Sequence, residues 1–195
     1  MNLKLSLALG GLLLWTSCGS SESDEVATKK EGPTAEEVIA EQKAIAEYYK
    51  ISYKGRYTIN KKTGKVDQLL LNNAPITDIG VDRIAKLTDL TTLNLVNTKI
   101  TDQGLRHIGN LPNLRKLEIA RNNITDAGVE YLMGLKKLEK LNLSYTRVAD
   151  KGLMKLGELP SLSYLNLSRS RVTPRGRDKF EKTPTGRKAG FSLVN

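Results

Sequence analysis

The sequence predicts an α/β solenoid of about five stacked strand–helix coils, closed at its N-terminal end by a helix and a hairpin. Three observations support this fold class. Apolar anchors recur every 24 residues, at Val66, Leu90, Leu114, Leu138 and Leu162. Each repeat has an alternating apolar pattern followed by a helical one. A fixed period of roughly 20 to 50 residues is typical of solenoids.

The two patterns within a repeat predict a strand and a short helix. In "LTTLNLVN" the side chains of Leu93 and Leu95 point to one face of a strand. In "ITDQGLRHIGNLP" the spacing of Leu105, Ile108 and Leu111 gives one face of a helix. One coil cannot bury its apolar side alone, so coils stack. We therefore expect parallel strands on a concave side, about 4.8 Å apart, and helices on a convex side.

These units resemble the short bacterial leucine-rich repeats whose signature contains TxITDxGLxxL, as in "NTKITDQGL" and "RNNITDAGV". They are also similar to the repeats of ribonuclease inhibitor and the F-box proteins. The resemblance covers residues 66–161 strongly and residues 162–184 weakly. It implies a right-handed α/β horseshoe segment that serves as a binding scaffold, with no particular partner. It also implies an asparagine ladder between coils, but that column reads Ala74, Thr98, Asn122, Thr146 and Ser170, so we expect small hydroxyls or an incomplete ladder.

The repeats are expected to fill residues 66–184. The units are 66–89, 90–113, 114–137, 138–161 and a degenerate last unit, 162–184. This last unit has Pro174 where the others have Asp and Arg177 where they have Leu or Val. Polar replacements in an outermost coil indicate a C-terminal cap. Residues 185–195 are then a basic C-terminal tail.

Residues 34–65 are expected to cap the N-terminal end. Thr34 and Glu37 form a capping box ahead of a helix over Thr34–Lys50. The apolar positions of that helix would lie over the first coil; they are Val38, Ile45, Tyr48 and Tyr49. The stretch "GRYTINKKTGKVDQLLL" predicts a hairpin that turns at Lys62–Gly64 into the first repeat strand.

The N-terminus predicts export and a lipid anchor. Residues 1–17 have Lys4, an apolar run from Leu5 to Trp15 and then small residues, as in a secretory signal peptide. "WTSC" resembles a bacterial lipobox, which implies that Cys18 carries acyl chains. An ordinary signal peptide with an incidental Cys18 is the alternative. Residues 18–33 are polar, charged and without periodicity, which indicates a disordered tether. An outer-membrane lipoprotein is expected, on either its periplasmic or its surface-exposed leaflet. The acidic residues Glu22, Asp24 and Glu25 soon after Cys18 resemble a surface-export signal of Bacteroidetes lipoproteins, which implies display on the outside.

The positive charge is concentrated at the C-terminal end. The formal net charge is +10, and the 27 residues from Arg169 onward hold 8 basic and 2 acidic residues. This basic end can bind anionic lipid headgroups or lipopolysaccharide. The alternative is that it is only the solvent-exposed edge of the C-terminal cap. Nucleic acid is not expected as a partner of an exported protein.

No residue pattern predicts catalysis, a metal or a cofactor. Asp78, Asp102, Asp126 and Asp150 form a column, but a Thr-Asp pair opening each helix suits capping better than calcium. The glycine column that follows it, from Gly80 to Gly176, indicates backbone geometry or close packing. His107 is expected to be exposed, with no second ligand nearby in the sequence. No P-loop, nucleophile elbow or dinucleotide motif occurs.

Outward-facing strand positions and the turns after them remain as a binding surface. The candidate partner-binding residues are Thr92, Asn94, Lys116, Glu118, Arg121, Lys140, Asn142, Tyr145, Tyr164, Asn166 and Arg169. Tyrosine and arginine are enriched at interface hot spots, and small side chains beside them leave room for a ligand. The sequence thus favours a non-catalytic module for a protein or peptide partner. The alternative is a structural or adhesive envelope protein that binds lipopolysaccharide or cell-wall glycan through its basic end.

Overall fold

The computed structural model describes residues 32–187 and 192–194 of the chain. The predictions for the signal peptide, for Cys18 and for most of the tether lie outside the described residues. The described residues from Pro33 onward belong to one unit.

Within residues 32–187 and 192–194, a seven-stranded sheet follows the order of the chain. The strand β1 (Arg56–Ile59) is antiparallel to β2 (Val66–Leu70), and each later strand is parallel to the one before it. The later strands are β3 (Thr92–Asn94), β4 (Lys116–Glu118), β5 (Lys140–Asn142), β6 (Tyr164–Asn166) and β7 (Ser192–Val194).

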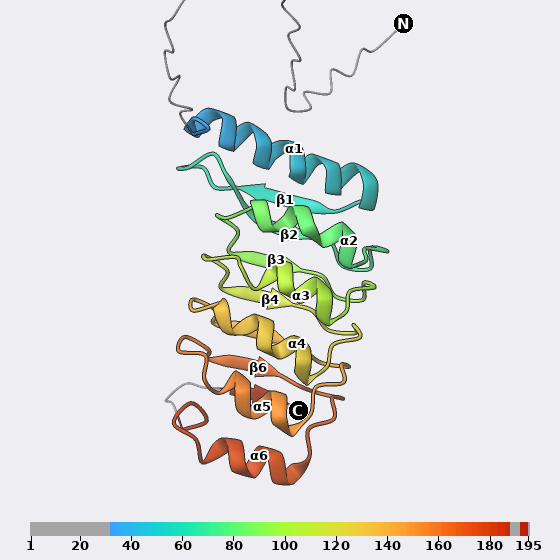
Figure 1. Ribbon diagram of the computed structural model, residues 1–195, viewed down its shortest axis with the longest axis vertical. Helices are drawn as coiled ribbons and strands as arrows, with labels where there is room; N and C mark the ends of the chain where they lie inside the picture. Colours follow the sequence, from blue (N-terminus) through green and yellow to red (C-terminus); the bar gives the residue numbers. More distant parts are fainter. Residues whose placement is uncertain (1–31, 188–191, 195) are drawn as a thin grey trace, which may run out of the picture. The chain divides into compact units, whose positions relative to one another are not determined.

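Helices cover one side of this sheet, one after another along the stack (Figure 1). They are α2 (Asp78–Val81), α3 (Asp102–Ile108), α4 (Asp126–Tyr131), α5 (Asp150–Leu156) and α6 (Pro174–Glu181). Short 3-10 helices extend α2 and α4, at Asp82–Lys86 and Leu132–Gly134. The predicted α/β solenoid is confirmed.

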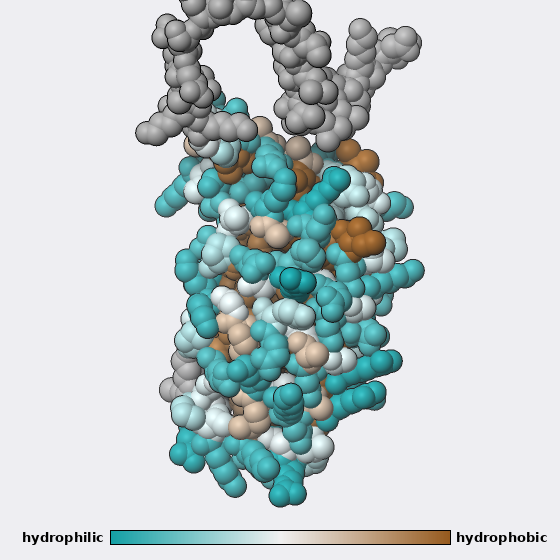
Figure 2. Space-filling view, viewed as in Figure 1, coloured by the Kyte–Doolittle hydropathy of each residue, from teal (hydrophilic) through white to brown (hydrophobic). Residues whose placement is uncertain are grey.

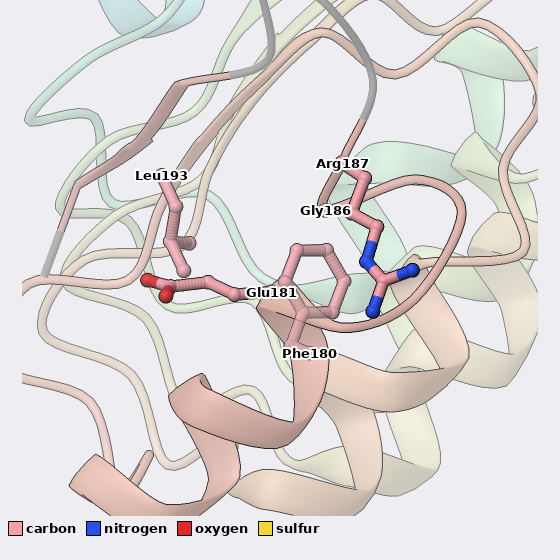
Figure 3. A pocket seen from close by; sticks show the side chains of 5 residues that line it. All are labelled: Phe180, Glu181, Gly186, Arg187 and Leu193. Atoms are coloured by element: carbon pink, nitrogen blue, oxygen red, sulfur yellow. The ribbon is translucent and has the colours of Figure 1, made fainter.

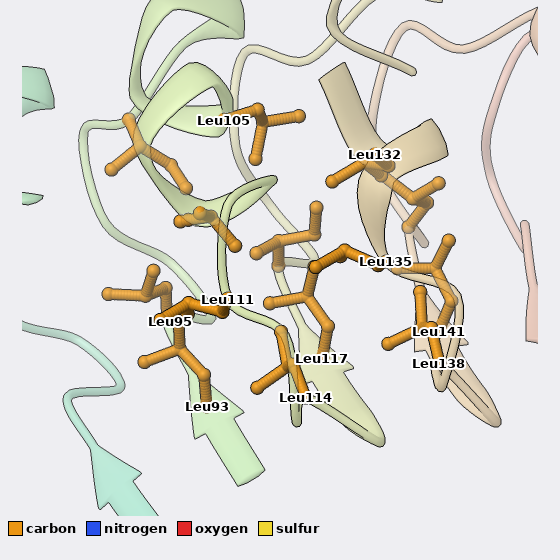
Figure 4. Close-up of a cluster of buried hydrophobic side chains, with 14 of the residues drawn as sticks. Leu93, Leu95, Leu105, Leu111, Leu114, Leu117, Leu132, Leu135, Leu138 and Leu141 are labelled. Atoms are coloured by element: carbon orange, nitrogen blue, oxygen red, sulfur yellow. The ribbon is translucent and has the colours of Figure 1, made fainter. Parts of the chain in front are cut away.

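The 24-residue period sets the register of the sheet. Leu93 pairs with Leu117, Leu117 with Leu141, and Leu141 with Leu165. All four side chains are fully buried. In Figure 4, leucines from strands, helices and turns of neighbouring coils interleave in one layer. Each fully buried leucine stabilises the fold by roughly 1.5–3 kcal/mol, so the stack is held mainly by this shared core.

The helix α1 (Ala35–Tyr53) closes the N-terminal end of the core. The Thr34 hydroxyl accepts a hydrogen bond from the Glu37 N–H at 3.2 Å, and the Glu37 carboxylate accepts one from the Thr34 N–H at 2.7 Å. The predicted capping box is therefore confirmed. The buried face differs in part from the expected one: Ile45 and Tyr49 are buried, but Tyr48 is 38% exposed.

Gln42 is a buried residue of α1 that the apolar pattern missed. Its Oε1 accepts a hydrogen bond from the Val66 N–H at 3.2 Å, and its Nε2 donates to Asp89 Oδ2 at 3.4 Å. Beside it, the Tyr49 hydroxyl donates to the Gly80 carbonyl, and burial raises the pKa of Tyr49. The cap thus uses polar side chains to satisfy backbone groups of the first coil.

The hairpin between β1 and β2 turns where the sequence predicts. The Asn60 carbonyl accepts a hydrogen bond from the Gly64 N–H at 2.8 Å. Gly64 has a φ of 71°, in the left-handed region that glycine adopts without a steric penalty.

The C-terminal end contains a strand that the sequence analysis did not include. Residues 185–195 were expected to be a basic tail, but β7 continues the sheet and Leu193 pairs with Leu165. The two leucines are 28 residues apart, whereas equivalent leucines of the earlier coils are 24 apart, so β7 falls outside the repeat template. The capping helix α6 buries Phe180 completely, and Leu193 packs partly buried against the same core.

The repeated Thr-Asp pair caps its own helix, as predicted, and it also connects neighbouring coils. The hydroxyls of Thr101, Thr125 and Thr173 each accept a hydrogen bond from a backbone N–H in the first turn of the helix that follows. Asp78 Oδ1 accepts hydrogen bonds from the Thr101 and Gly104 N–H groups at 2.7 and 3.0 Å. Asp78 Oδ2 accepts one from the Thr101 hydroxyl at 2.6 Å. Thr125 donates in the same way to Asp102, and Thr173 to Asp150. Each aspartate therefore holds the start of the next coil's helix.

From Gly104 onward, the glycines of the column face this aspartate ladder. A Cβ on Gly104 would lie 2.6 Å from Asp78 Oδ1, and a Cβ on Gly128 would lie 2.3 Å from Asp102 Oδ1. Only glycine lets the preceding carboxylate approach, which confirms the expected close packing.

The hydrogen bonds from Thr173 lower the pKa of Asp150, because they favour its charged form.

The asparagine ladder is incomplete, as expected. Asn122 Oδ1 accepts a hydrogen bond from the Thr98 hydroxyl at 2.8 Å, and Asn122 Nδ2 donates to the Leu95 carbonyl at 2.7 Å. In the next coil the Thr146 hydroxyl donates at 2.6 Å to Leu143, within its own coil. Asn122 therefore ties two coils together, whereas Thr146 does not reach a neighbouring coil.

Candidate functional site

The sheet face away from the helices collects the strand residues that the sequence selected. Thr92, Lys116, Lys140 and Tyr164 are neighbours in register, and so are Asn94, Glu118, Asn142 and Asn166. Lys116 and Lys140 are exposed, and the other six are half-buried. The two columns therefore form one continuous polar surface across β3 to β6.

Glu118 is neutralised within this surface. Its Oε1 lies 3.2 Å from Lys116 Nζ, and its Oε2 accepts a hydrogen bond from Asn142 Nδ2 at 2.7 Å. No ion pair involves Lys140 in the part of the chain that the structure describes. The strand face consequently presents excess positive charge.

The asparagines of the second column also have a structural role. The side-chain oxygens of Asn94, Asn142 and Asn166 each accept a hydrogen bond from the backbone N–H two residues later, at 2.9–3.0 Å. Such local bonds turn the chain out of the strand. Their oxygens are therefore occupied, and these residues offer a partner less than the sequence suggested.

The turn after each strand has a left-handed backbone. Residues with φ between 54° and 61° recur at 24-residue steps: Asn73, Asn97, Arg121, Tyr145 and Arg169. The first four donate their backbone N–H to a carbonyl of the next coil at 2.8–2.9 Å, so the stacking fixes this geometry. Asparagine tolerates this region, whereas arginine and tyrosine are strained by about 1–2 kcal/mol each.

The strained residues line a hollow in the molecular surface of about 430 Å³. Its lining consists of Arg121, Asn122, Asn123, Tyr145, Thr146, Arg147 and Arg169. The Arg121 guanidinium lies 4.2 Å from the centroid of the Tyr145 ring, a cation–π contact. Tyr145 is 47% exposed, and all three arginines are exposed.

Arg147 is the member of this hollow that the sequence analysis missed. The predicted binding residues lie at strand positions and at the first turn position, whereas Arg147 lies two residues further along the turn. The signal was present, because the same template position holds Lys99 and Arg171. Basic residues at two turn positions therefore converge on one edge of the sheet.

Two other hollows are weaker candidates for a binding site. The hollow in Figure 3, of about 370 Å³, lies between the end of α6 and β7, where Phe180, Glu181, Arg187 and Leu193 face one another. It marks the seam where the C-terminal strand joins the cap. A hollow of about 500 Å³ lies beside β1 and is lined by Lys50, Gly55, Arg56, Tyr57 and Ile59.

The helix side is a weaker candidate for docking. In Figure 2 hydrophilic side chains dominate this face, and hydrophobic ones gather near the ends of α1 and α2. Ile51 and Ile79, which are 75% and 86% exposed, belong to these two helices. His107 of α3 is half-buried, not exposed as expected.

Residues 32–187 and 192–194 lack two further features. No group of three or more His, Cys, Asp or Glu side chains there could hold a metal ion. No helix in the same residues is long and apolar enough to cross a membrane.

Family comparisons identify the repeats. The family described as "Leucine rich repeat" matches residues 112–172, and that described as "Leucine Rich repeats (2 copies)" matches residues 90–131. Leucine-rich repeats are therefore recognised within residues 90–172 of this chain. The aspartate ladder, the left-handed turns and the polar sheet face are thus features of a leucine-rich repeat solenoid.

A solved internalin structure shares this fold. An internalin (inlF) from Listeria monocytogenes is 24% identical with a TM-score of 0.54, over 66% of this chain and 34% of that one. The chain therefore spans about a third of that internalin's length. The receptor kinase SOBIR1 ectodomain from Arabidopsis thaliana is 13% identical with a TM-score of 0.43, over 69% of this chain and 82% of that one. No curated protein matches the chain significantly.

Proposed function

We propose that this chain is a non-catalytic binding module that holds a protein or peptide partner on its sheet face and the adjoining turns. The observation that carries the proposal is the in-register pairing of β4, β5 and β6, which brings Lys116, Lys140 and Tyr164 together. Leucine-rich repeat domains generally mediate protein–protein interaction, which agrees with this surface.

The side-chain chemistry of the surface supports a peptide partner. Tyr145 and Tyr164 can supply contact area at a low entropy cost, because tyrosine has few rotatable bonds. Lys116, Lys140 and the turn arginines can orient an acidic partner. Adjacent coils place equivalent side chains about 5 Å apart, so one extended segment can touch several coils.

We expect the double variant Tyr145→Ala with Tyr164→Ala to lose partner capture by more than tenfold. Removing two central aromatic contacts typically costs more than about 2 kcal/mol of binding free energy. The measurement is cross-linked capture from the native cells, alongside a thermal melt that should stay unchanged.

Arg106→Ala with His107→Ala on α3 is the matched control, because it alters the helix side alone. If the helix-side pair abolished capture and the tyrosine pair did not, the partner would bind the helix side and not the sheet face.

The proposal includes anchoring in a bacterial envelope through Cys18. It is supported by the apolar run from Leu5 to Trp15 that precedes this single cysteine. Cys18→Ala should move the protein from the membrane to the soluble fraction and end incorporation of labelled fatty acid. Ser20→Ala should change neither result. Label retained in Cys18→Ala would show that another residue carries the lipid, and protease added to intact cells tests display on the outer surface.

An adhesive envelope protein is the second candidate function. Arg169, Arg171 and Arg175 are exposed at the C-terminal end, which suits lipopolysaccharide or another anionic surface. Exposed charges are screened beyond about 10 Å at 0.1 M salt. Attachment to purified lipopolysaccharide that disappears at moderate ionic strength would favour this candidate, and capture of a protein or peptide from the native cells favours the peptide-binding module.

A further inference from the structure

We propose that the hollow at the ends of β4, β5 and β6 recognises an acidic peptide segment, with Arg121, Arg147 and Arg169 as its carboxylate-binding residues. This inference rests on the proposed function and names the chemistry of the partner. It depends on four independent features of the turn surface.

The first feature is a positive charge in the hollow that no acidic side chain neutralises. The hollow is lined by three arginines and by no acidic residue. In the residues that the structure describes, no carboxylate forms an ion pair with any of the three. Elsewhere in the same coils basic side chains do find carboxylates, as Arg115 does with Glu139 and Lys155 with Glu158. The arginines of the hollow are thus available to an external anion.

The second feature is backbone strain at two of the arginines and at Tyr145. Their left-handed turns are occupied by asparagine in the first two coils, at Asn73 and Asn97. Larger side chains at such positions raise the energy of the folded state, and strained positions cluster at functional sites. Stability alone would favour asparagine in all five turns, so the long side chains point to a role in binding.

The third feature is that polar groups around the hollow already form hydrogen bonds within the protein. The backbone N–H groups of Arg121, Tyr145 and Arg147 all donate to carbonyls of a neighbouring coil, at 2.8–2.9 Å. The Asn122 amide and the Thr146 hydroxyl are also bound within the protein. Compact phosphate sites typically use free backbone N–H groups. These three N–H groups are therefore not free to bind a ligand, which favours several separate carboxylates over one phosphate.

The fourth feature is spacing. Arg121 and Arg169 occupy the same turn position two coils apart, which corresponds to about 10 Å. A peptide in the polyproline II conformation rises about 3.1 Å per residue with three residues per turn, so acidic side chains three residues apart lie on one face and would reach both arginines. Between them Tyr145 holds the Arg121 guanidinium by stacking and offers its own exposed edge to the peptide.

Fluorescence anisotropy with labelled hexaglutamate tests the site directly on the purified chain. The variant Arg121→Asn/Arg147→Gln/Arg169→Asn should weaken binding by at least tenfold. Because asparagine suits the left-handed turn, the melting temperature of this variant should equal or exceed that of the parent. Loss of binding can therefore not be attributed to unfolding.

The charge-matched control is Lys43→Gln/Lys136→Gln/Lys151→Gln, which removes three exposed cations outside the hollow. This control should change hexaglutamate binding less than twofold. Inorganic phosphate should displace the peptide no better than chloride at equal ionic strength. Equal losses in the two variants, displacement by phosphate, or no binding to the parent chain would each overturn the inference.

Partner capture from cells separates this inference from the proposed function. The tyrosine pair tests the binding face, whereas the arginine variant tests the acidic-peptide site. If capture failed with the tyrosine pair and persisted with the arginine variant, the acidic-peptide site would be overturned and the binding module would stand. Loss of capture in both variants supports both proposals.

Discussion

Leu117→Asp is expected to unfold the solenoid at room temperature. Leu117 is fully buried, and its pairing with Leu93 and Leu141 places it in the shared core of three coils. An unpaired carboxylate there would cost several kcal/mol in addition to the lost packing. Folded domains are stable by only about 5–15 kcal/mol, so this one change removes most or all of the stability. Circular dichroism and a thermal melt measure the loss.

The neighbouring residue gives a strict control for that variant. Lys116→Asp introduces the same carboxylate one position earlier, on the exposed face of β4, where it also replaces the exposed ion pair of Lys116 with Glu118. It should leave the fold intact and change stability within about 1 kcal/mol, as surface substitutions usually do. A Leu117→Asp protein that melted like the parent would mean that this leucine lies outside the core.

The register could be predicted because it depends on one strong signal. The 24-residue step fixes which leucines stack, and burial of all of them follows from the alternation within each strand. The capping box of α1 and the hairpin turn at Gly64 were predictable for a similar reason, since both depend on residues close in sequence.

Contacts between coils were harder to predict. Each aspartate was expected to act at its own helix, but its carboxylate also accepts hydrogen bonds from a threonine 23 residues later. The strand β7 was missed because its leucine is four residues out of step with the repeat. Gln42 was missed because a polar residue on an apolar face carries no hydrophobic signal, although it is buried and hydrogen-bonded.

The repeat pattern predicts which residues share the binding surface, but it does not predict what each side chain binds there. The columns fixed by the repeat include Lys116, Lys140 and Tyr164, which are neighbours in the sheet. The occupied oxygens of Asn94 and Asn166 depend on side-chain rotamers, which the repeat pattern does not encode.

Gly128→Ala is expected to destabilise the domain by about 2–4 kcal/mol, the opposite of what helix propensity predicts. Gly128 lies inside α4, where alanine is ordinarily favoured over glycine by about 1 kcal/mol. Here the new Cβ would lie 2.3 Å from Asp102 Oδ1. The carboxylate would have to leave the Thr125 N–H and hydroxyl, which it holds at 2.8 and 2.6 Å. Hydrogen bonds to charged groups contribute about 1.5–3 kcal/mol each.

A double-mutant cycle with Asp102→Ala assigns that loss to the ladder. Once the carboxylate is gone, the added methyl group of Gly128→Ala meets no obstacle from it, so the change should be neutral or stabilise by up to about 1 kcal/mol. The melting temperature of Gly128→Ala alone should fall by roughly 5–15 °C, because each kcal/mol shifts the melting temperature of such a domain by about 2–4 °C. Additive losses in the double variant would contradict the ladder as the reason for glycine. A strong coupling between the two sites would establish that the aspartate of one coil requires the glycine of the next.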